Sequence, residues 1–194
     1  MAPNYPNLSW GTSDGIHLNQ YEPSGAYDVI ISDRVVEHLH PDDLVAHFEG
    51  THALLSSSGR YIVSTPQAYA GPADISRVFQ SDSVNGMHLK EYMHAEISTA
   101  FRAAGFQRCH AVLRISAGYR TPIRGGCKPR MSRTYTSYIR LLENVIATIP
   151  QQHLRRRATK ALKPLLFPSN IMMVAVKSLV KVRTTASKEP TMLP

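Results

Sequence analysis

The fold is decided by the stretch Tyr27-Asp28-Val29-Ile30-Ile31-Ser32-Asp33-Arg34-Val35-Val36-Glu37-His38-Leu39. Its near-continuous apolar run, residues 26–32, is typical of a strand that is covered on both faces within a parallel sheet. The polar residues after this run lie at the carboxyl end of that strand, where open α/β sheets bind ligands. The stretch therefore predicts an α/β fold with a candidate site immediately after the strand.

Strand and helix patterns alternate outward from this stretch. Proline suits the first position of a helix, so Pro41 marks a helix start, and Gly105 suits a C-terminal cap. We expect further strands at 61–63, 106–115 and 170–177 and helices from 41 to 55, at 90–104, and at about 135–148 and 151–163, with loop at 116–134. This alternation predicts a mostly parallel sheet with helices on both faces.

The 194 residues and the hydrophobic content of 43% fit one domain. We expect this domain to cover 1–183, with a helical insertion at about 116–168 before the last strand. Residues 1–25 are rich in Pro, Gly, Asn and Ser, which indicates loop with one possible strand around Leu8 to Trp10. The composition of 184–194 predicts a disordered tail.

The net charge of +8 is a property of the C-terminal region. Residues 1–150 hold 13 Lys+Arg and 13 Asp+Glu, whereas 151–194 hold 9 basic residues and 1 acidic residue. Such a region could meet phosphate or an anionic membrane, although a solvated basic face is the commoner explanation. Nucleic acid is therefore not the expected partner.

Nothing in the sequence predicts secretion or membrane insertion. The segment from Met1 to Trp10 has no basic start and no apolar core. The apolar run from Ile171 to Val176 is far shorter than the ~20 residues of a bilayer span. Cys109 and Cys127 fit neither a metal motif nor a disulfide scaffold. We expect a cytoplasmic protein without a transmembrane segment.

Four short motifs in order carry a resemblance to a known family: "YDVIIS" from Tyr27, "EHL" from Glu37, "LLSSSGR" from Leu54 and "STP" from Ser64. The order resembles the central and C-terminal part of class I S-adenosylmethionine-dependent methyltransferases, over about residues 26–106. The resemblance implies part of a Rossmann-like sheet with the spatial strand order 3-2-1-4-5-7-6, of which this chain holds strand 3 onward. The glycine-rich cofactor loop of the family falls before Met1, so we expect an N-terminally truncated product.

The resemblance implies a methyltransferase, or its C-terminal portion. Its cofactor would be S-adenosylmethionine, with binding weakened or lost, and its acceptor a small molecule, a sugar or a lipid. The alternative is a catalytically inactive interaction module that binds an acidic partner or a membrane surface through its basic C-terminal region. Strand 4 of the family, residues 26–32 here, would be an exposed apolar edge. We expect a partner chain or self-association to cover that edge.

The resemblance also implies the cofactor-binding residues. Asp14, followed by Gly15, falls where a carboxylate contacts the adenine ring, although Asp-Gly is also a strong turn dipeptide. Ser32, Asp33 and Arg34 would line the methionine portion of the cofactor. The alternative is that Asp33 merely caps the segment after the strand and Arg34 is solvated.

Glu37 and His38 are the candidate catalytic residues. His38 could act as a general base because the ordinary pKa of histidine is near neutral pH. A hydrogen-bonded structural histidine is the alternative. His40, Asp42, Asp43 and His47 come next, but their spacing is not that of a metal motif and the aspartates suit a helix start, so no metal site is expected.

The candidate acceptor-binding residues are Thr65, His88 and Tyr92. Thr65 belongs to the "STP" strand end, and His88 and Tyr92 match an "H-apolar-x-x-[YF]" pattern of relatives. His88 could equally cap the next helix. The long polar loop 67–85 could be a lid over the acceptor.

Overall fold

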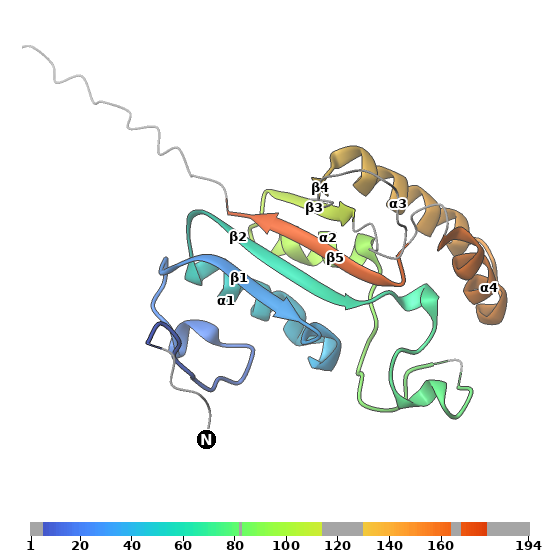
Figure 1. The fold of residues 1–194 in the computed structure, drawn as a ribbon, viewed down its shortest axis with the longest axis horizontal. Helices are drawn as coiled ribbons and strands as arrows, with labels where there is room; N and C mark the ends of the chain where they lie inside the picture. Colours follow the sequence, from blue (N-terminus) through green and yellow to red (C-terminus); the bar gives the residue numbers. More distant parts are fainter. Residues whose placement is uncertain (1–5, 82, 114–129, 164–167, 178–194) are drawn as a thin grey trace, which may run out of the picture.

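A computed structural model describes residues 6–81, 83–113, 130–163 and 168–177. Short 3-10 helices connect the larger elements: η1 (Leu18–Gln20), η2 (Val36–His38), η3 (Pro41–Asp43), η4 (Ala68–Ala70) and η5 (Ile75–Arg77). The strands and α-helices, drawn in Figure 1, are β1 (Tyr27–Asp33), α1 (Leu44–Leu54), β2 (Leu55–Pro66), α2 (His94–Ala103), β3 (Arg108–Leu113), β4 (Arg130–Met131), α3 (Arg133–Ala147), α4 (Gln152–Leu162) and β5 (Asn170–Val176).

The strands form one sheet in the order β1-β2-β5-β3-β4. β1 and β2 are parallel and are joined through α1, because a parallel connection needs a crossover element. β5 starts beside the end of β2, where Asn170 pairs with Pro66, and therefore runs back antiparallel to β2 and β3. β4 is also antiparallel to β3. The α/β class is confirmed, but the sheet is mixed and β1–β2 is the one parallel pair among the described strands.

The core lies between the sheet and the helices α1 and α2. Phe48 of α1 and Phe101 of α2 pack with their ring centroids 4.4 Å apart. Tyr61 of β2 and Phe106 meet Phe101 edge to face, at 5.7 and 5.4 Å. Such pairs add about 0.5–1.5 kcal/mol to the gain from burying the rings. The core therefore fixes α1 and α2 against β2, which positions the loops at the end of that strand.

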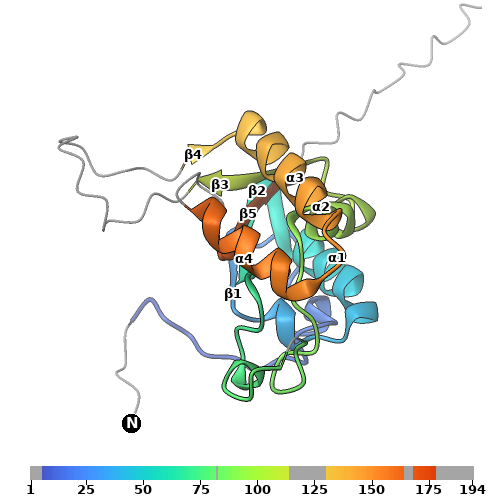
Figure 2. The ribbon, with the colours of Figure 1, turned by 90° about the vertical axis from the view of Figure 1, so that its right-hand side faces the viewer.

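α3 extends the same helical layer. It packs on β3 through Ala111, which lies opposite Met173 and therefore faces the same side as the core. α4 packs against α3 and η4, near the end of β2 (Figure 2). The helices α1, α2 and α3 thus share one face, and the described residues place no helix over the other. The expected covering of both faces is not found in this part of the chain.

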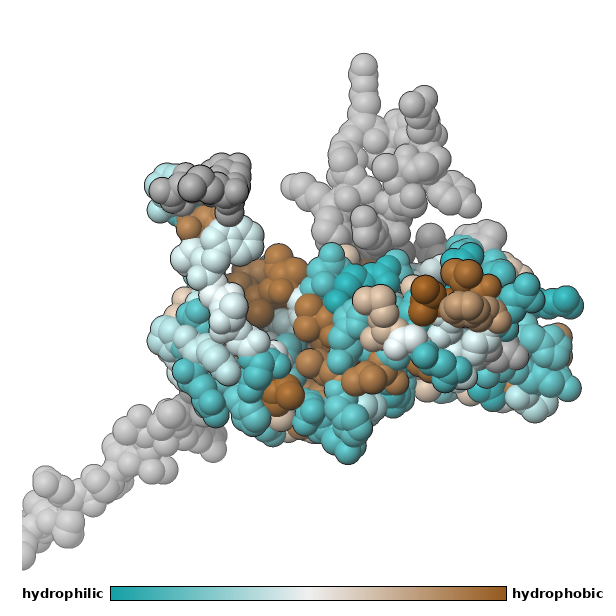
Figure 3. All heavy atoms as spheres, turned by 90° about the horizontal axis from the view of Figure 1, so that it is seen from below, coloured by the Kyte–Doolittle hydropathy of each residue, from teal (hydrophilic) through white to brown (hydrophobic). Residues whose placement is uncertain are grey.

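β1 is the outer strand of the described sheet. Val29 and Ile31 are 51% and 67% exposed, so the apolar run is not covered on both faces. Figure 3 looks at the molecule of Figure 1 from below, and brown apolar surface is visible on this side. The predicted exposed apolar edge at 26–32 is confirmed. The expected strand at Leu8 to Trp10 is wrong, because these residues form no strand and are exposed.

Most of the predicted elements are found, with shifted ends. β2 begins at Leu55 rather than Tyr61, because the chain bulges around Ser58 (φ +70°) and stays extended on both sides of it. The expected loop at 116–134 is interrupted by β4, which pairs with β3. The rest of that loop, 116–129, and the predicted tail at 184–194 lie outside the described residues. In the part of the chain that is described, no helix has the length and apolarity to cross a membrane.

Candidate active site

Predicted site residues converge at the carboxyl ends of β1 and β2. Arg34 takes a left-handed backbone conformation (φ +59°), which turns the chain sharply, and its amide donates to Ser64 of β2 at 2.9 Å. A non-glycine residue in this conformation is uncommon and is often found at functional sites. The turn leads directly into η2, which directs Glu37 inward and leaves His38 exposed.

Glu37 is fully buried and is held from two sides. Its Oε2 accepts a hydrogen bond from the Thr65 hydroxyl at 2.9 Å, and its backbone oxygen accepts from Leu89 and Lys90. Its Oε1 is buried and has no hydrogen-bond partner among the described residues. Buried polar atoms without a partner are rare, because they lose their hydration without replacement. This oxygen is therefore available for a ligand.

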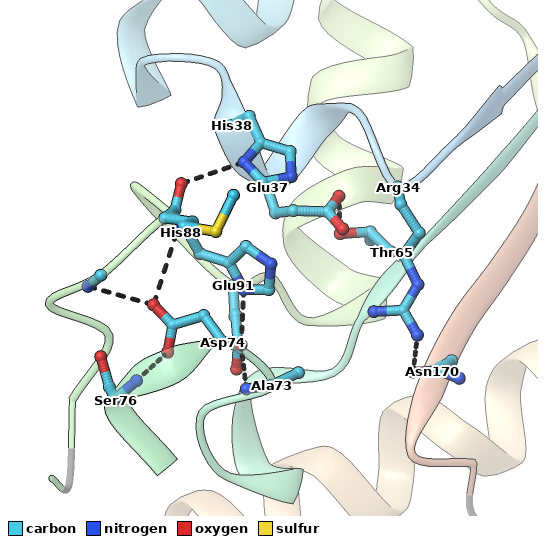
Figure 4. A network of polar contacts seen from close by, with 12 residues as sticks. Arg34, Glu37, His38, Thr65, Ala73, Asp74, Ser76, His88, Glu91 and Asn170 are labelled. Carbon is cyan, nitrogen blue, oxygen red and sulfur yellow. Dashed lines mark hydrogen bonds and ion pairs between the residues drawn. The ribbon is translucent and has the colours of Figure 1, made fainter. Parts of the chain in front are cut away.

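His38 and His88 face each other beside Glu37 (Figure 4). Their ring centroids are 5.0 Å apart and the rings are nearly perpendicular, at 73°. His38 Nδ1 contacts the Met87 carbonyl at 3.0 Å, and His88 Nδ1 contacts Glu91 Oε1 at 3.0 Å. Since a carbonyl oxygen only accepts, His38 Nδ1 is the donor there. In both rings Nε2 is therefore the nitrogen that can bind a ligand.

Hydrogen bonds to Glu91 and Asp74 fix the segment around His88. Glu91 accepts from the Ala73 amide at 2.6 Å, and burial raises the pKa of Glu91, against the hydrogen bonds from Ala73 and His88 that lower it. Asp74 accepts from the amides of Ser76 and Gly86 at 3.0 and 3.1 Å. These contacts close the loop 74–86 at its base. The position of His88 is therefore set by the loop that precedes it as well as by Glu37.

The predicted cofactor-binding residues are separated. Asp14 accepts from the amides of Ile16 and His17 at 2.9 and 2.8 Å, so its carboxylate stabilises a turn. The Gly15 carbonyl contacts His47 Nδ1. Ser32 is buried within β1. Of the five residues, the structure leaves the side chains of Asp33 and Arg34 exposed at the end of β1.

The predicted acceptor-binding residues are also divided. Thr65 and His88 join the Glu37 cluster. Tyr92 is 1% exposed and belongs to the core, where burial raises the pKa of its hydroxyl to about 12. Its ring lies under the Lys90 ammonium, 5.1 Å from the centroid. Tyr92 therefore packs beneath the site and has no exposed surface for an acceptor.

A basic cavity of about 400 Å³ adjoins the end of β1. Arg34 reaches it from β1 and hydrogen-bonds Asn170 at 3.1 Å. The loop 70–77 and α4 supply the other walls, and Arg156 packs so closely on Gly71 that a Cβ there would lie 2.8 Å from its Nε. The cations of the lining are Arg34, Arg77, Arg156, Lys160 and Lys163, and its described residues include no carboxylate. The sequence located the basic excess but did not predict that α4 lines the same cavity as Arg34.

No model of a known protein family matches this sequence, and no curated protein matches it. Solved structures of other proteins, however, superpose on this chain. A SAM-dependent methyltransferase from Archaeoglobus fulgidus superposes with a TM-score of 0.50 at 14% identity, over 89% of this chain and 69% of that one. The complex between the Haloferax volcanii Trm112 methyltransferase activator and a methyltransferase gives a TM-score of 0.51 at 15% identity, over 91% of this chain and 65% of that one.

The strand order β1-β2-β5-β3 corresponds to 4-5-7-6 of the order that the resemblance implies. The described chain therefore has the fold of class I S-adenosylmethionine-dependent methyltransferases, and it spans about two thirds of these two structures.

Proposed function

We propose that this chain acts on the acceptor side in methyl transfer from S-adenosylmethionine. The observation that carries the proposal is the convergence of Glu37, His38, Thr65 and His88 at the carboxyl ends of two parallel strands, where α/β folds bind ligands. The cofactor supplies a methyl group on a sulfonium, and direct displacement depends mainly on holding the nucleophile in line. The chain's own residues would provide that positioning.

Asp33 and Arg34 fit one end of this cofactor. Both side chains are exposed at the carboxyl end of β1. A carboxylate and a guanidinium match the ammonium and carboxylate groups of a methionine moiety, respectively, in charge and hydrogen bonding. Asp14 and Gly15 use their polar groups within the chain, and Ser32 is buried. The chain therefore offers one wall of a cofactor site.

His38 is suited to take a proton from the acceptor. Its Nδ1 is held by the Met87 carbonyl, so the neutral ring presents an unprotonated Nε2 to the exposed side of the site. A base in this position would activate a hydroxyl or amine as it attacks the methyl group. Thr65 and Glu37 position η2 beneath it.

The acceptor carries an anionic group in this proposal. The basic cavity lies next to Arg34 and is lined by five cations, so it complements a phosphate or carboxylate rather than a neutral sugar. Lys160 and Lys163 are exposed, and their Ala variants should leave the fold intact. Titration with inorganic phosphate at low salt should show about 10-fold weaker binding in the double variant. Arg157→Ala, on the same helix but outside the cavity, is the matched control.

Calorimetric titration with S-adenosylmethionine tests the proposed function. Wild type should bind, and Asp33→Ala and Arg34→Ala should each bind at least about 10-fold more weakly, a loss of about 1.4 kcal/mol. Asp42→Ala and Arg157→Ala remove the same charges elsewhere on the surface and should bind as wild type does. Phosphate binding without any S-adenosylmethionine binding would instead favour an inactive interaction module.

A further inference from the structure

We propose that Glu37, His38 and His88 form a binding site for one divalent transition-metal ion. Each of the three offers a ligand atom, and these atoms all lie within 4.8 Å of one another. Two ligands of one tetrahedral ion, with bonds of about 2.1 Å, lie about 3.4 Å apart. The three groups therefore need to close by about 1.4 Å or less to reach that separation. The site does not rest on the proposed methyl transfer, but a metal ion and an acceptor proton would compete for the same His38 Nε2.

The ligands are already oriented as an ion requires. Histidines that ligate metals usually donate their second ring nitrogen to a carboxylate or a backbone carbonyl, which fixes the ring and its tautomer. His88 makes this contact with Glu91, at 3.0 Å, and His38 makes it with the Met87 carbonyl, also at 3.0 Å. Both rings therefore turn Nε2 toward the space between them.

The carboxylate of Glu37 gives independent evidence for a cation at this position, because one of its oxygens lacks a partner. Its Oε2 is occupied by Thr65, but its Oε1 is buried and unpartnered within the described structure. A cation between this oxygen and the two imidazoles would satisfy it. The nearby cations are engaged elsewhere, since Lys90 pairs with Glu96 at 2.7 Å and Arg34 hydrogen-bonds Asn170.

The donor set indicates the class of ion. Two imidazoles and one carboxylate are ligands for zinc and for neighbouring first-row divalent ions, whereas calcium and magnesium prefer oxygen alone. Three protein ligands leave at least one coordination position open, as in catalytic rather than structural zinc sites. His38 is exposed, so this open position faces solvent. A small molecule could therefore reach the ion.

Titration of the chelator-treated full chain with zinc chloride, followed by calorimetry, tests the site. Wild type should bind one zinc ion with an affinity that falls at least about 10-fold in His38→Ala and in His88→Ala. His40→Ala, two residues from His38 but outside the cluster, should bind as wild type does. Because His38 is exposed, its variant tests the site even if His88→Ala is unstable.

Glu91→Gln separates a metal site from a chance cluster. The variant keeps an acceptor for His88 but removes the charge behind it, and such partners are worth about 10–100-fold in metal affinity. Weakened zinc binding in Glu91→Gln and His38→Ala supports the site. Equal zinc binding by wild type, His38→Ala and His88→Ala, or no binding of one zinc ion by wild type, would overturn it.

Discussion

The described residues include two buried histidine–glutamate pairs with nearly the same geometry and different surroundings. In one, His94 Nδ1 meets Glu143 Oε1 at 2.8 Å; in the other, His88 Nδ1 meets Glu91 Oε1 at 3.0 Å. Glu143 also accepts from the amides of His94 and Ala95, so it closes the N-terminus of α2 and ties α3 to it. Both oxygens of Glu143 thus accept hydrogen bonds from the chain's own groups.

The second pair holds the His88 ring beside His38 and within reach of Glu37, whose Oε1 is buried and unpartnered among the described residues. Burial of a histidine–glutamate pair therefore does not by itself indicate function. What distinguishes the two pairs is whether polar atoms are left over after the fold has formed.

Replacing Glu143 should have the largest effect on stability. Glu143→Ala leaves the His94 ring and two helix amides without an acceptor in the core, and breaking such a buried pair typically costs about 3–5 kcal/mol. The free energy of unfolding from urea denaturation measures the loss. Zinc affinity per folded molecule should be unchanged. A loss below about 1 kcal/mol would show that the first pair does not carry the structural role given to it.

Glu91→Ala should weaken zinc binding and cost less stability than Glu143→Ala does. It leaves the Ala73 amide and the His88 ring unpaired, which costs about 1–3 kcal/mol, less than the change at Glu143. Its zinc affinity should fall at least about 10-fold because His88 is no longer oriented. Urea denaturation and calorimetry on the same preparation give both values. Unchanged zinc affinity together with a large loss of stability would make the two pairs equivalent.

The two glutamates should respond oppositely to acid. Burial tends to raise the pKa of Glu143, but the hydrogen bonds from His94 and the α2 amides outweigh it and hold the pKa below its ordinary value. Its contribution is present above about pH 4.5, the unfolded value, and is lost as the pH falls through the folded pKa. Burial raises the pKa of Glu91 above its ordinary value of about 4.5. The stability that this shift contributes to the folded state is therefore present below about pH 4.5 and is lost as the pH rises through the folded pKa.

Urea denaturation of wild type and both Ala variants between about pH 3 and pH 7 measures this smaller effect. The stability difference between wild type and Glu143→Ala should shrink toward acid pH. The difference for Glu91→Ala should grow. Parallel pH profiles for the two variants would contradict the opposite surroundings of the two carboxylates.

Much of the fold could be predicted from the sequence because its signals are local. The apolar run before Ser32, Pro41 at the start of a helix and Gly105 (φ +93°) at the end of α2 each act within a few residues. Pairing between distant strands is not local, so the sequence placed β5 along the chain but did not predict that it runs antiparallel to its neighbours. β4 was missed because two residues carry no periodicity.

The site was predicted only in part for the same reason. Glu37 and His38 are adjacent, and their signal is visible in one motif. His88 lies 50 residues beyond His38, so no local motif links the two rings. Tyr92 matches its motif, but burial against the core is a property of the folded chain.

The most direct test of the account is the imidazole NMR spectrum of histidine-labelled protein during titration with S-adenosylmethionine. The ring signals of His38 and His88 should shift as the cofactor binds near the end of β1, whereas the His94 ring, enclosed with Glu143, should keep its position. Shifts confined to His38 and His88 are the predicted result. Equal movement of His94, or no movement of any ring, would contradict the assignment of function to this end of the sheet.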